Sequence, residues 1–183
     1  MKHLFTLLLF TVFFNSFSQS TKFEFTKDGF TDFLVTEIPD LKATEIYTKT
    51  LNWIKENYNN PDEVIKMTIV NEKIRINGYS KSYTCANSMG VKVCSDANYI
   101  IEISFKDNKY KIDPIELSSL NPDNPTVKSN FDFNNTEIYF DKKGELKKFT
   151  KDFPKDVEFL FNGINESLKN YILGLNKDVE NDW

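Results

Sequence analysis

The hydrophobic repeat of this chain changes twice along its length, which limits the folds it can adopt. Apolar residues recur every three to four positions over residues 42–58 and again over 156–176, the spacing of amphipathic helices. Between these segments the repeat falls to two, which is typical of antiparallel strands with one buried and one solvated face. The pattern predicts an α+β fold with two helices on one face of a sheet.

Six short segments carry the two-residue repeat and are predicted to be strands. Their apolar residues are Phe33 and Val35; Ile65, Met67 and Ile69; Ile74 and Ile76; Tyr99, Ile101, Ile103 and Phe105; Tyr110 and Ile112; and Ile138 and Phe140. Residues 117–130 include Pro122 and Pro125 among Ser, Asn and Asp, so this segment is predicted to be a loop.

The N-terminus has the three-part pattern of a secretory signal peptide: a basic start, an apolar run over residues 4–14, and small residues after it. Ser16 and Ser18 occupy the −3 and −1 positions if cleavage falls between Ser18 and Gln19. The apolar run is shorter than the roughly 20 residues that a membrane-spanning helix needs. We therefore expect residues 1–18 to be removed during export.

Cleavage would leave a single α+β domain over residues 19–176 and a polar C-terminal tail over 177–183. No other apolar segment is long enough to span a membrane, so no membrane span is expected after cleavage. The expected location is the periplasm or the extracellular space.

Loss of the signal also removes His3, which is the only histidine. Catalysis by Ser-His or Cys-His pairs, and zinc binding by HExxH, are then excluded, and no cofactor is expected. A pair of carboxylates could still hydrolyse a glycoside. Glu102, Asp113 and Glu116 lie on or near neighbouring predicted strands and are the candidates for such a pair.

The chain has two cysteines, Cys85 and Cys94, placed between the strand of Ile74 and the strand of Tyr99. In an exported protein this pair predicts a disulfide that closes a loop between the two strands. A zinc site would require two further soft ligands, and a redox motif would place the cysteines two residues apart. The predicted role is therefore structural.

One strand carries a row of polar residues opposite Ile74 and Ile76. The row consists of Lys73, Arg75, Asn77, Tyr79, Lys81 and Tyr83. Cations and tyrosines together suggest a docking face for an anionic glycan or a protein partner, since Tyr and Arg are favoured at interfaces. The alternative is an ordinary solvated face of the sheet.

The segment from Phe33 to about Ile112 resembles a bacterial family called domain of unknown function 4468. The residues that carry the resemblance are Val35-x-x-Ile38-Pro39, Tyr47, Trp53-Ile54, Asn57-Tyr58 and Ile74-x-Ile76-x-Gly78. The resemblance implies a fold like that of the TATA-box-binding protein (TBP), with helices on one face of a curved antiparallel sheet. It implies no catalytic or binding residue, because the family has no assigned activity.

The charge of the chain argues against nucleic acid as a partner, whatever the fold. The formal net charge is −4 and Arg75 is the only arginine, whereas nucleic-acid binding needs a basic surface. The sequence favours an exported, non-catalytic envelope or extracellular module that binds a protein, a glycan or another envelope component. A carboxylate-dependent hydrolase and a self-assembling structural domain are the alternatives, and the oligomeric state is left open.

Overall fold

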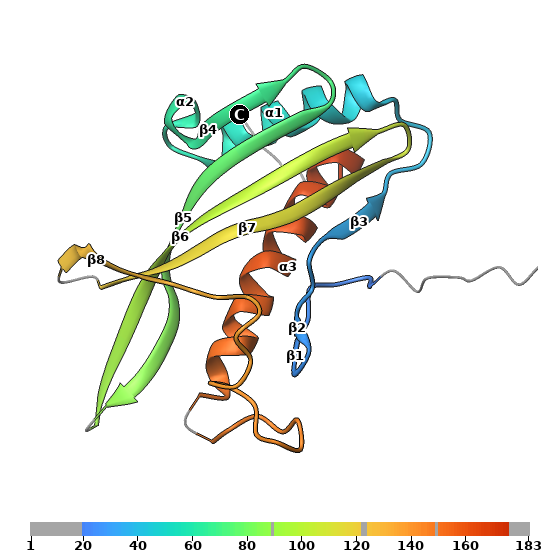
Figure 1. Ribbon diagram of the computed structural model, residues 1–183. Coiled ribbons are helices and arrows are strands. Elements are labelled where there is room, and N and C mark those ends of the chain that lie inside the picture. Colours follow the sequence, from blue (N-terminus) through green and yellow to red (C-terminus); the bar gives the residue numbers. More distant parts are fainter. Residues whose placement is uncertain (1–19, 89, 122–123, 149, 176–183) are drawn as a thin grey trace, which may run out of the picture.

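A computed structural model of the chain describes residues 20–88, 90–121, 124–148 and 150–175 (Figure 1). The predicted signal peptide, its cleavage site at Ser18 and Gln19, and the predicted tail lie outside these residues. In chain order, the elements are β1 (Phe25–Thr26), β2 (Gly29–Phe30), β3 (Leu34–Glu37), α1 (Ala43–Asn57), α2 (Pro61–Val64), β4 (Ile65–Ile69), β5 (Lys73–Ser88), β6 (Val91–Lys106), β7 (Lys109–Asn121), β8 (Asn124–Asn130) and α3 (Asp152–Leu173).

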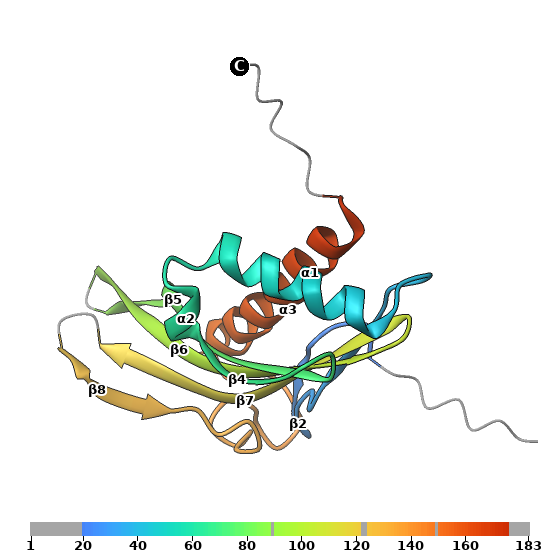
Figure 2. The same cartoon turned by 90° about the horizontal axis from the view of Figure 1, so that it is seen from above.

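Strands β3 to β8 form one antiparallel sheet in the order β3-β7-β6-β5-β4, and β8 pairs with the far end of β7. Strands β1 and β2 form a separate small hairpin. The long strands curve around α3, and α1 and α3 lie on the same side of the sheet (Figure 2). The predicted α+β fold, a curved antiparallel sheet with two helices on one face, is therefore confirmed.

The two long helices occur where the helical repeat predicted them, and each buries its apolar stripe. Asp107, in the turn between β6 and β7, accepts a hydrogen bond of 3.0 Å from the first backbone N–H of α1, at Ala43. The helices are joined where the Trp53 indole N–H donates to Ser167 Oγ at 3.0 Å. No helix within the described ranges is long and apolar enough to cross a membrane.

The main core fills the space between the sheet and the helices. Its fully buried members include Ile74, Ile76, Ile101, Ile103 and Ile112 from the strands and Ile46, Ile54, Phe161 and Leu168 from the helices. Phe161 also joins a second group of aromatic rings. Its ring lies 5.9 Å from Phe23, 5.5 Å from Phe30 and 6.1 Å from Phe133, so α3 links the sheet to the N-terminal hairpin.

The predicted loop over residues 117–130 is wrong, because β7 continues to Asn121 and β8 pairs with it. Two of the three residues Leu117 to Ser119 are buried, and the Ser118 hydroxyl donates to Asn130 Oδ1 at 2.9 Å. The prolines misled the prediction. Pro125 lies in β8, which pairs on one side only among the described strands, and an edge strand tolerates proline.

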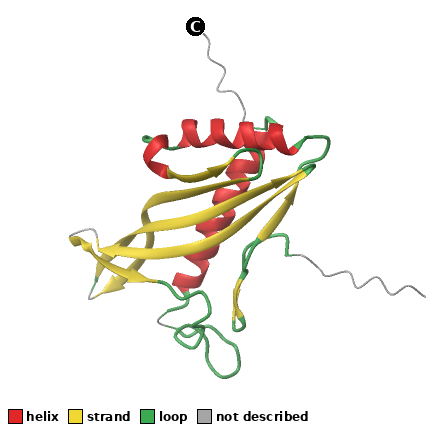
Figure 3. Cartoon of the chain, turned by 45° about the horizontal axis from the view of Figure 1, so that its top comes forward, coloured by secondary structure: helices red, strands yellow, loops and turns green. Residues whose placement is uncertain are grey.

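The predicted strand ending in Ile138 and Phe140 is also wrong. Phe140 forms an isolated bridge with Leu146, and the described residues between β8 and α3 are otherwise turns and loops (Figure 3). Ile138 is 53% exposed. The rings of Tyr139 and Phe140 pack on Phe25 of the N-terminal hairpin rather than on the sheet, which explains their apolar character without a strand.

Phe33 and Val35 were predicted to supply a short first strand, and a strand is present there as β3, but Phe33 lies just before it and is 45% exposed. Strand β3 pairs with β7 so that Leu34 lies opposite Ile112 and Thr36 opposite Tyr110. Because Ile112 and Tyr110 face the helices, Leu34 and Thr36 are the buried residues.

Candidate functional site

The predicted row on β5 is divided between two sides of the sheet. Lys73, Arg75, Asn77 and Tyr79 alternate with the buried Ile74, Ile76 and Gly78, so they face away from the helices. We call this side the open face. Tyr83 does not continue the row, because its ring packs against Phe153 of α3. Its hydroxyl bonds to Ser119, and burial raises the pKa of Tyr83 to about 12.

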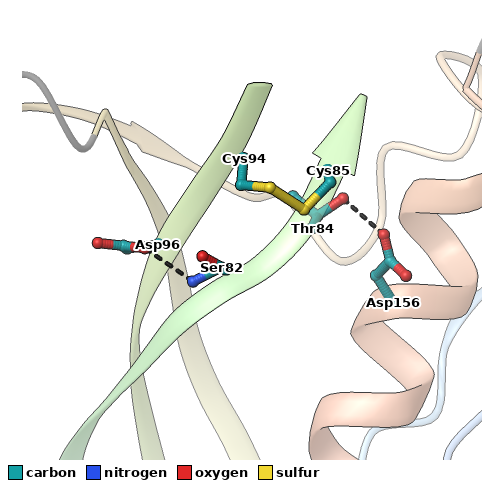
Figure 4. The surroundings of a disulfide bond; sticks show 6 residues. All are labelled: Ser82, Thr84, Cys85, Cys94, Asp96 and Asp156. Carbon is teal, nitrogen blue, oxygen red and sulfur yellow. Dashed lines mark hydrogen bonds between the residues drawn. A yellow bond between two sulfur atoms is a disulfide. The ribbon is translucent and has the colours of Figure 1, made fainter. Parts of the chain in front are cut away.

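An irregularity in the pairing of β5 with β6 explains this division. The register shifts between Ser80 and Thr84, and Ser82 has a φ of 52°. Asp96 on β6 holds the distortion, because its Oδ1 accepts a hydrogen bond of 2.7 Å from the Ser82 N–H (Figure 4). Its Oδ2 accepts the Tyr79 hydroxyl. These two bonds lower the pKa of Asp96. No sequence pattern predicts the shift, since an unbroken strand would also fit residues 73–88.

The predicted disulfide is present between Cys85 and Cys94 (Figure 4). The predicted loop around it is wrong, because the two residues lie directly opposite each other where β5 pairs with β6. The disulfide therefore joins the two arms of one hairpin. Next to it, the Thr84 hydroxyl donates to Asp156 Oδ2 at 2.6 Å and ties this hairpin to α3.

Replacing Cys85 and Cys94 together by alanine should lower the free energy of unfolding by about 2.5–3 kcal/mol, because the bond closes a short loop in the unfolded chain. Urea unfolding with and without dithiothreitol measures this. The reductant should lower the midpoint of the wild type and leave the double variant unchanged. Equal midpoints for oxidised and reduced wild type would contradict the prediction.

On the open face, Glu102 of β6 lies between Lys73 and Arg75, the two paired cations of β5. Lys73 Nζ is 2.6 Å from Glu102 Oε1, and Arg75 Nη2 is 2.6 Å from Glu102 Oε2. Burial of Glu102 opposes its ionisation, but the hydrogen bonds and charges of Lys73 and Arg75 outweigh burial and lower its pKa. The carboxylate thus stays ionised and fixes the positions of both cations.

This arrangement predicts a dependence of stability on pH. Because the folded pKa of Glu102 lies below its ordinary value of 4.5, the carboxylate stabilises the fold above that pH. The stabilisation should be lost as the pH falls through the folded pKa. Glu102→Gln should cost about 1–3 kcal/mol at pH 7, and the difference from wild type should shrink as the pH falls from 5 to 3 in urea unfolding series. If the difference in unfolding free energy between Glu102→Gln and the wild type stayed constant over this pH range, the lowered pKa of Glu102 would be contradicted.

Three further lysines lie on the open face at the hairpin between β6 and β7. Lys106, Lys109 and Lys111 line a hollow of about 380 Å³ together with Val35 and Ser104. Lys111 Nζ pairs with Asp113 at 2.8 Å and lies 5.0 Å from the centre of the Phe33 ring. Lys109 Nζ is 3.9 Å from Glu37.

The open face therefore carries more positive than negative charge at this end. Its cations are Lys73, Arg75, Lys106, Lys109 and Lys111, and the acids beside them are Glu37, Glu102 and Asp113. The whole chain has a net charge of −4, so this excess is a local feature. Sequence reasoning found Lys73 and Arg75. It missed the lysines, although they alternate with buried residues as the row does.

The three candidate catalytic carboxylates are not placed alike. Glu102 and Asp113 lie opposite each other on β6 and β7, and each is paired with a cation. Glu116 lies opposite Ile100 and is exposed, and its Oε1 is 3.0 Å from the Ser118 hydroxyl. In the part of the chain that the structure describes, no three Cys, His, Asp or Glu residues are grouped to hold a metal ion.

Comparisons with known proteins concern the fold. Residues 33–119 match the family model described as a domain of unknown function (DUF4468) with TBP-like fold. A crystal structure of a DUF4468 family protein from Bacteroides ovatus matches with a TM-score of 0.64 and 12% identity, over 76% of this chain and 84% of that one. A TBP-like protein from Parabacteroides distasonis matches with a TM-score of 0.54 and 16% identity, over 77% and 90%. No curated protein matches the chain.

Proposed function

Since residues 33–119 match the model of the DUF4468 family, whose name assigns no activity, we propose a function from the surfaces of this chain. The protein is an exported, non-catalytic module that binds an anionic glycan of the envelope or the extracellular space. The binding site is the positive end of the open face. The single observation that carries this proposal is the group of five cations beside the hollow at Lys106, Lys109 and Lys111.

The chemistry of the open face favours a glycan over a protein. Stable protein interfaces are enriched in aromatic residues and depleted in lysine, whereas four of these five cations are lysines. The hollow is lined by the amines of three lysines and the hydroxyl of Ser104, which suit carboxylate and hydroxyl groups, together with Val35, Phe105 and Tyr110. Tyr79, which is 52% exposed, lies on the same face.

Export is supported by the signal-peptide pattern of residues 1–18 and by the disulfide, which is typical of oxidising compartments. The non-catalytic role is supported by the carboxylates. A glycosidase general acid needs a raised pKa, but the pKa of Glu102 is lowered and Asp113 pairs with Lys111.

Charge reversal tests the proposed site. Lys106→Glu combined with Lys109→Glu should weaken binding of polygalacturonate about tenfold or more at low salt, because it reverses two charges at the hollow. Calorimetry or affinity electrophoresis measures this. Neutral dextran should not bind, and added salt should weaken the binding of the wild type.

The matched control is Lys155→Glu combined with Lys169→Glu, which changes the net charge equally but lies on exposed positions of α3. This control should bind polygalacturonate as the wild type does. An equal loss in both double variants would mean that only net charge matters. Tight binding of polyglutamate without polygalacturonate would identify an acidic protein as the partner. Either result would overturn the proposal.

A further inference from the structure

The open face continues past the cations of β5 as a surface with little charge. The outward residues that follow Lys73 and Arg75 on β5 are Asn77 and Tyr79. Opposite residues of paired strands point to the same side of a sheet, so β6 and β7 add residues beside them. The resulting rows are Asn77, Ile100 and Glu116, and next to it Tyr79, Asn98 and Ser118. Glu116 is the only acidic or basic residue in the two rows.

Two side-chain amides in these rows are available to a ligand. Asn77 and Asn98 are each partly exposed, and neither carboxamide is hydrogen-bonded to another residue in the described ranges. Each presents a carbonyl oxygen that accepts hydrogen bonds and an NH2 group that donates them. A carboxamide therefore bonds two hydroxyl groups at once, one as acceptor and one as donor, which suits neighbouring hydroxyls of a sugar ring.

The ring of Tyr79 is held in position beside these amides. Its hydroxyl donates to Asp96, whose other carboxylate oxygen accepts the Ser82 N–H. The ring is thus anchored at its far end, while 52% of the residue surface remains exposed. A fixed, exposed aromatic ring offers an apolar surface on which the C–H groups of a pyranose pack, and little side-chain entropy is lost on binding.

The charge of the open face changes from one end to the other. Three lysines line the hollow at the positive end. At the amides, the exposed carboxylate of Glu116 accepts hydrogen bonds from hydroxyl groups but repels another carboxylate. Beyond Tyr79, the charge of Asp96 is offset by Lys81, which acts on it as a nearby cation. The positive end therefore favours an acidic sugar, and the end at the amides favours an uncharged one.

We propose that Asn77, Tyr79 and Asn98 form a second subsite of the glycan site, which takes an uncharged sugar ring. This inference rests on the proposed function and defines its ligand more closely, as a glycan that contains both acidic and uncharged sugars. The uncharged ring stacks on Tyr79 and bonds the two amides, and the acidic sugars lie at the positive end. We call these three residues the amide subsite.

The two subsites lie in line along one strand. Lys73 shares a cross-strand row with Ser104 and Lys111 of the hollow. At the usual rise of a strand, Lys73 and Tyr79 are about 20 Å apart along β5. This distance exceeds the length of a single sugar, so one oligosaccharide of several sugars contacts both subsites.

Oligosaccharides of matched length test the proposal by calorimetry. Every ring of hexagalacturonate is charged, whereas hexasaccharides from hyaluronate and from glucuronoxylan place uncharged sugars beside acidic ones. At least one of these mixed fragments should bind the wild type more tightly than hexagalacturonate, although it carries less charge. Tyr79→Ala should weaken binding of that fragment about fivefold or more and binding of hexagalacturonate less than about twofold, because only the uncharged ring loses its stacking surface.

Two further variants separate binding from folding. Asn77→Ala breaks no hydrogen bond within the described part of the protein and should also weaken binding of the mixed fragment. Tyr171→Ala is the matched control, because the Tyr171 hydroxyl likewise donates to a carboxylate, that of Glu56, but between α3 and α1. This control should leave the binding of both oligosaccharides unchanged.

The proposal is overturned if neither mixed fragment binds more tightly than hexagalacturonate, or if Tyr79→Ala weakens both kinds of oligosaccharide equally. Unchanged binding of the mixed fragment to Tyr79→Ala and Asn77→Ala has the same consequence. Lys106→Glu with Lys109→Glu should weaken binding of every acidic oligosaccharide. If only this last result is obtained, the amide subsite fails and the proposed function stands. If no oligosaccharide binds, both fail.

Discussion

Phe161→Ala should lower the free energy of unfolding by about 3–5 kcal/mol, the usual range for removing a fully buried aromatic ring. The ring contacts Phe23 and Phe30 of the N-terminal segment, Phe133 of the segment before α3, and Tyr99 of the sheet. Three separate parts of the chain therefore lose a shared neighbour, and a rigid surrounding cannot close the cavity. Equilibrium unfolding in urea measures the change.

The same helix supplies the control. Phe159→Ala removes the same side chain two residues earlier, where the ring is mostly exposed. Its effect on the free energy of unfolding should stay within about 0.5 kcal/mol. Similar losses at both positions would mean that Phe161 is not the centre of the aromatic group.

Gly78→Ala should be destabilising by about 3 kcal/mol, although it adds only a methyl group. A Cβ at Gly78 would lie 2.2 Å from Cζ and 2.4 Å from the hydroxyl of Tyr99. Tyr99 cannot move aside, because its hydroxyl bonds to Tyr58 at 2.9 Å and its ring packs on Phe161. The added atom must therefore displace the β5 backbone or break the tyrosine pair.

Gly163→Ala is the matched substitution for this prediction. Its new Cβ meets nothing, and alanine is favoured over glycine in a helix, so it should raise stability by up to about 1 kcal/mol. Thermal unfolding should thus shift in opposite directions for the two variants. A neutral Gly78→Ala would show that the ring of Tyr99 is free to move.

The hydrophobic repeat was sufficient to predict the elements that bury a complete stripe. Both long helices and the strands around Ile74, Ile101 and Ile112 follow it, because burial on one face repeats at a fixed period. The repeat failed where an apolar side chain is buried by a loop or hairpin outside the core between the sheet and the helices. Phe140 alternates with Ile138 as a strand would, yet the ring is covered by a second aromatic group rather than by helices.

The candidate sites were less accessible to sequence reasoning than the fold. Lys73 and Arg75 could be placed on one face, but the carboxylate that fixes them, Glu102, comes from another strand. The departure of Tyr83 from the row depends on Asp96, also on β6, and no local pattern marks that bond. Cross-strand partners depend on register, which the alternation alone leaves undetermined.

The order in which the core is assembled has a consequence for how the protein is made. Phe23 belongs to the first described residues, yet its backbone N–H donates to Asn162 at 2.8 Å and its ring packs on Phe161, both on the last helix. A ribosome delivers that helix after all the other described elements, so the emerging chain cannot close its core beforehand. The core is therefore completed only once this helix has been made, and for the exported protein proposed above the precursor would stay open enough to pass a translocation channel until then.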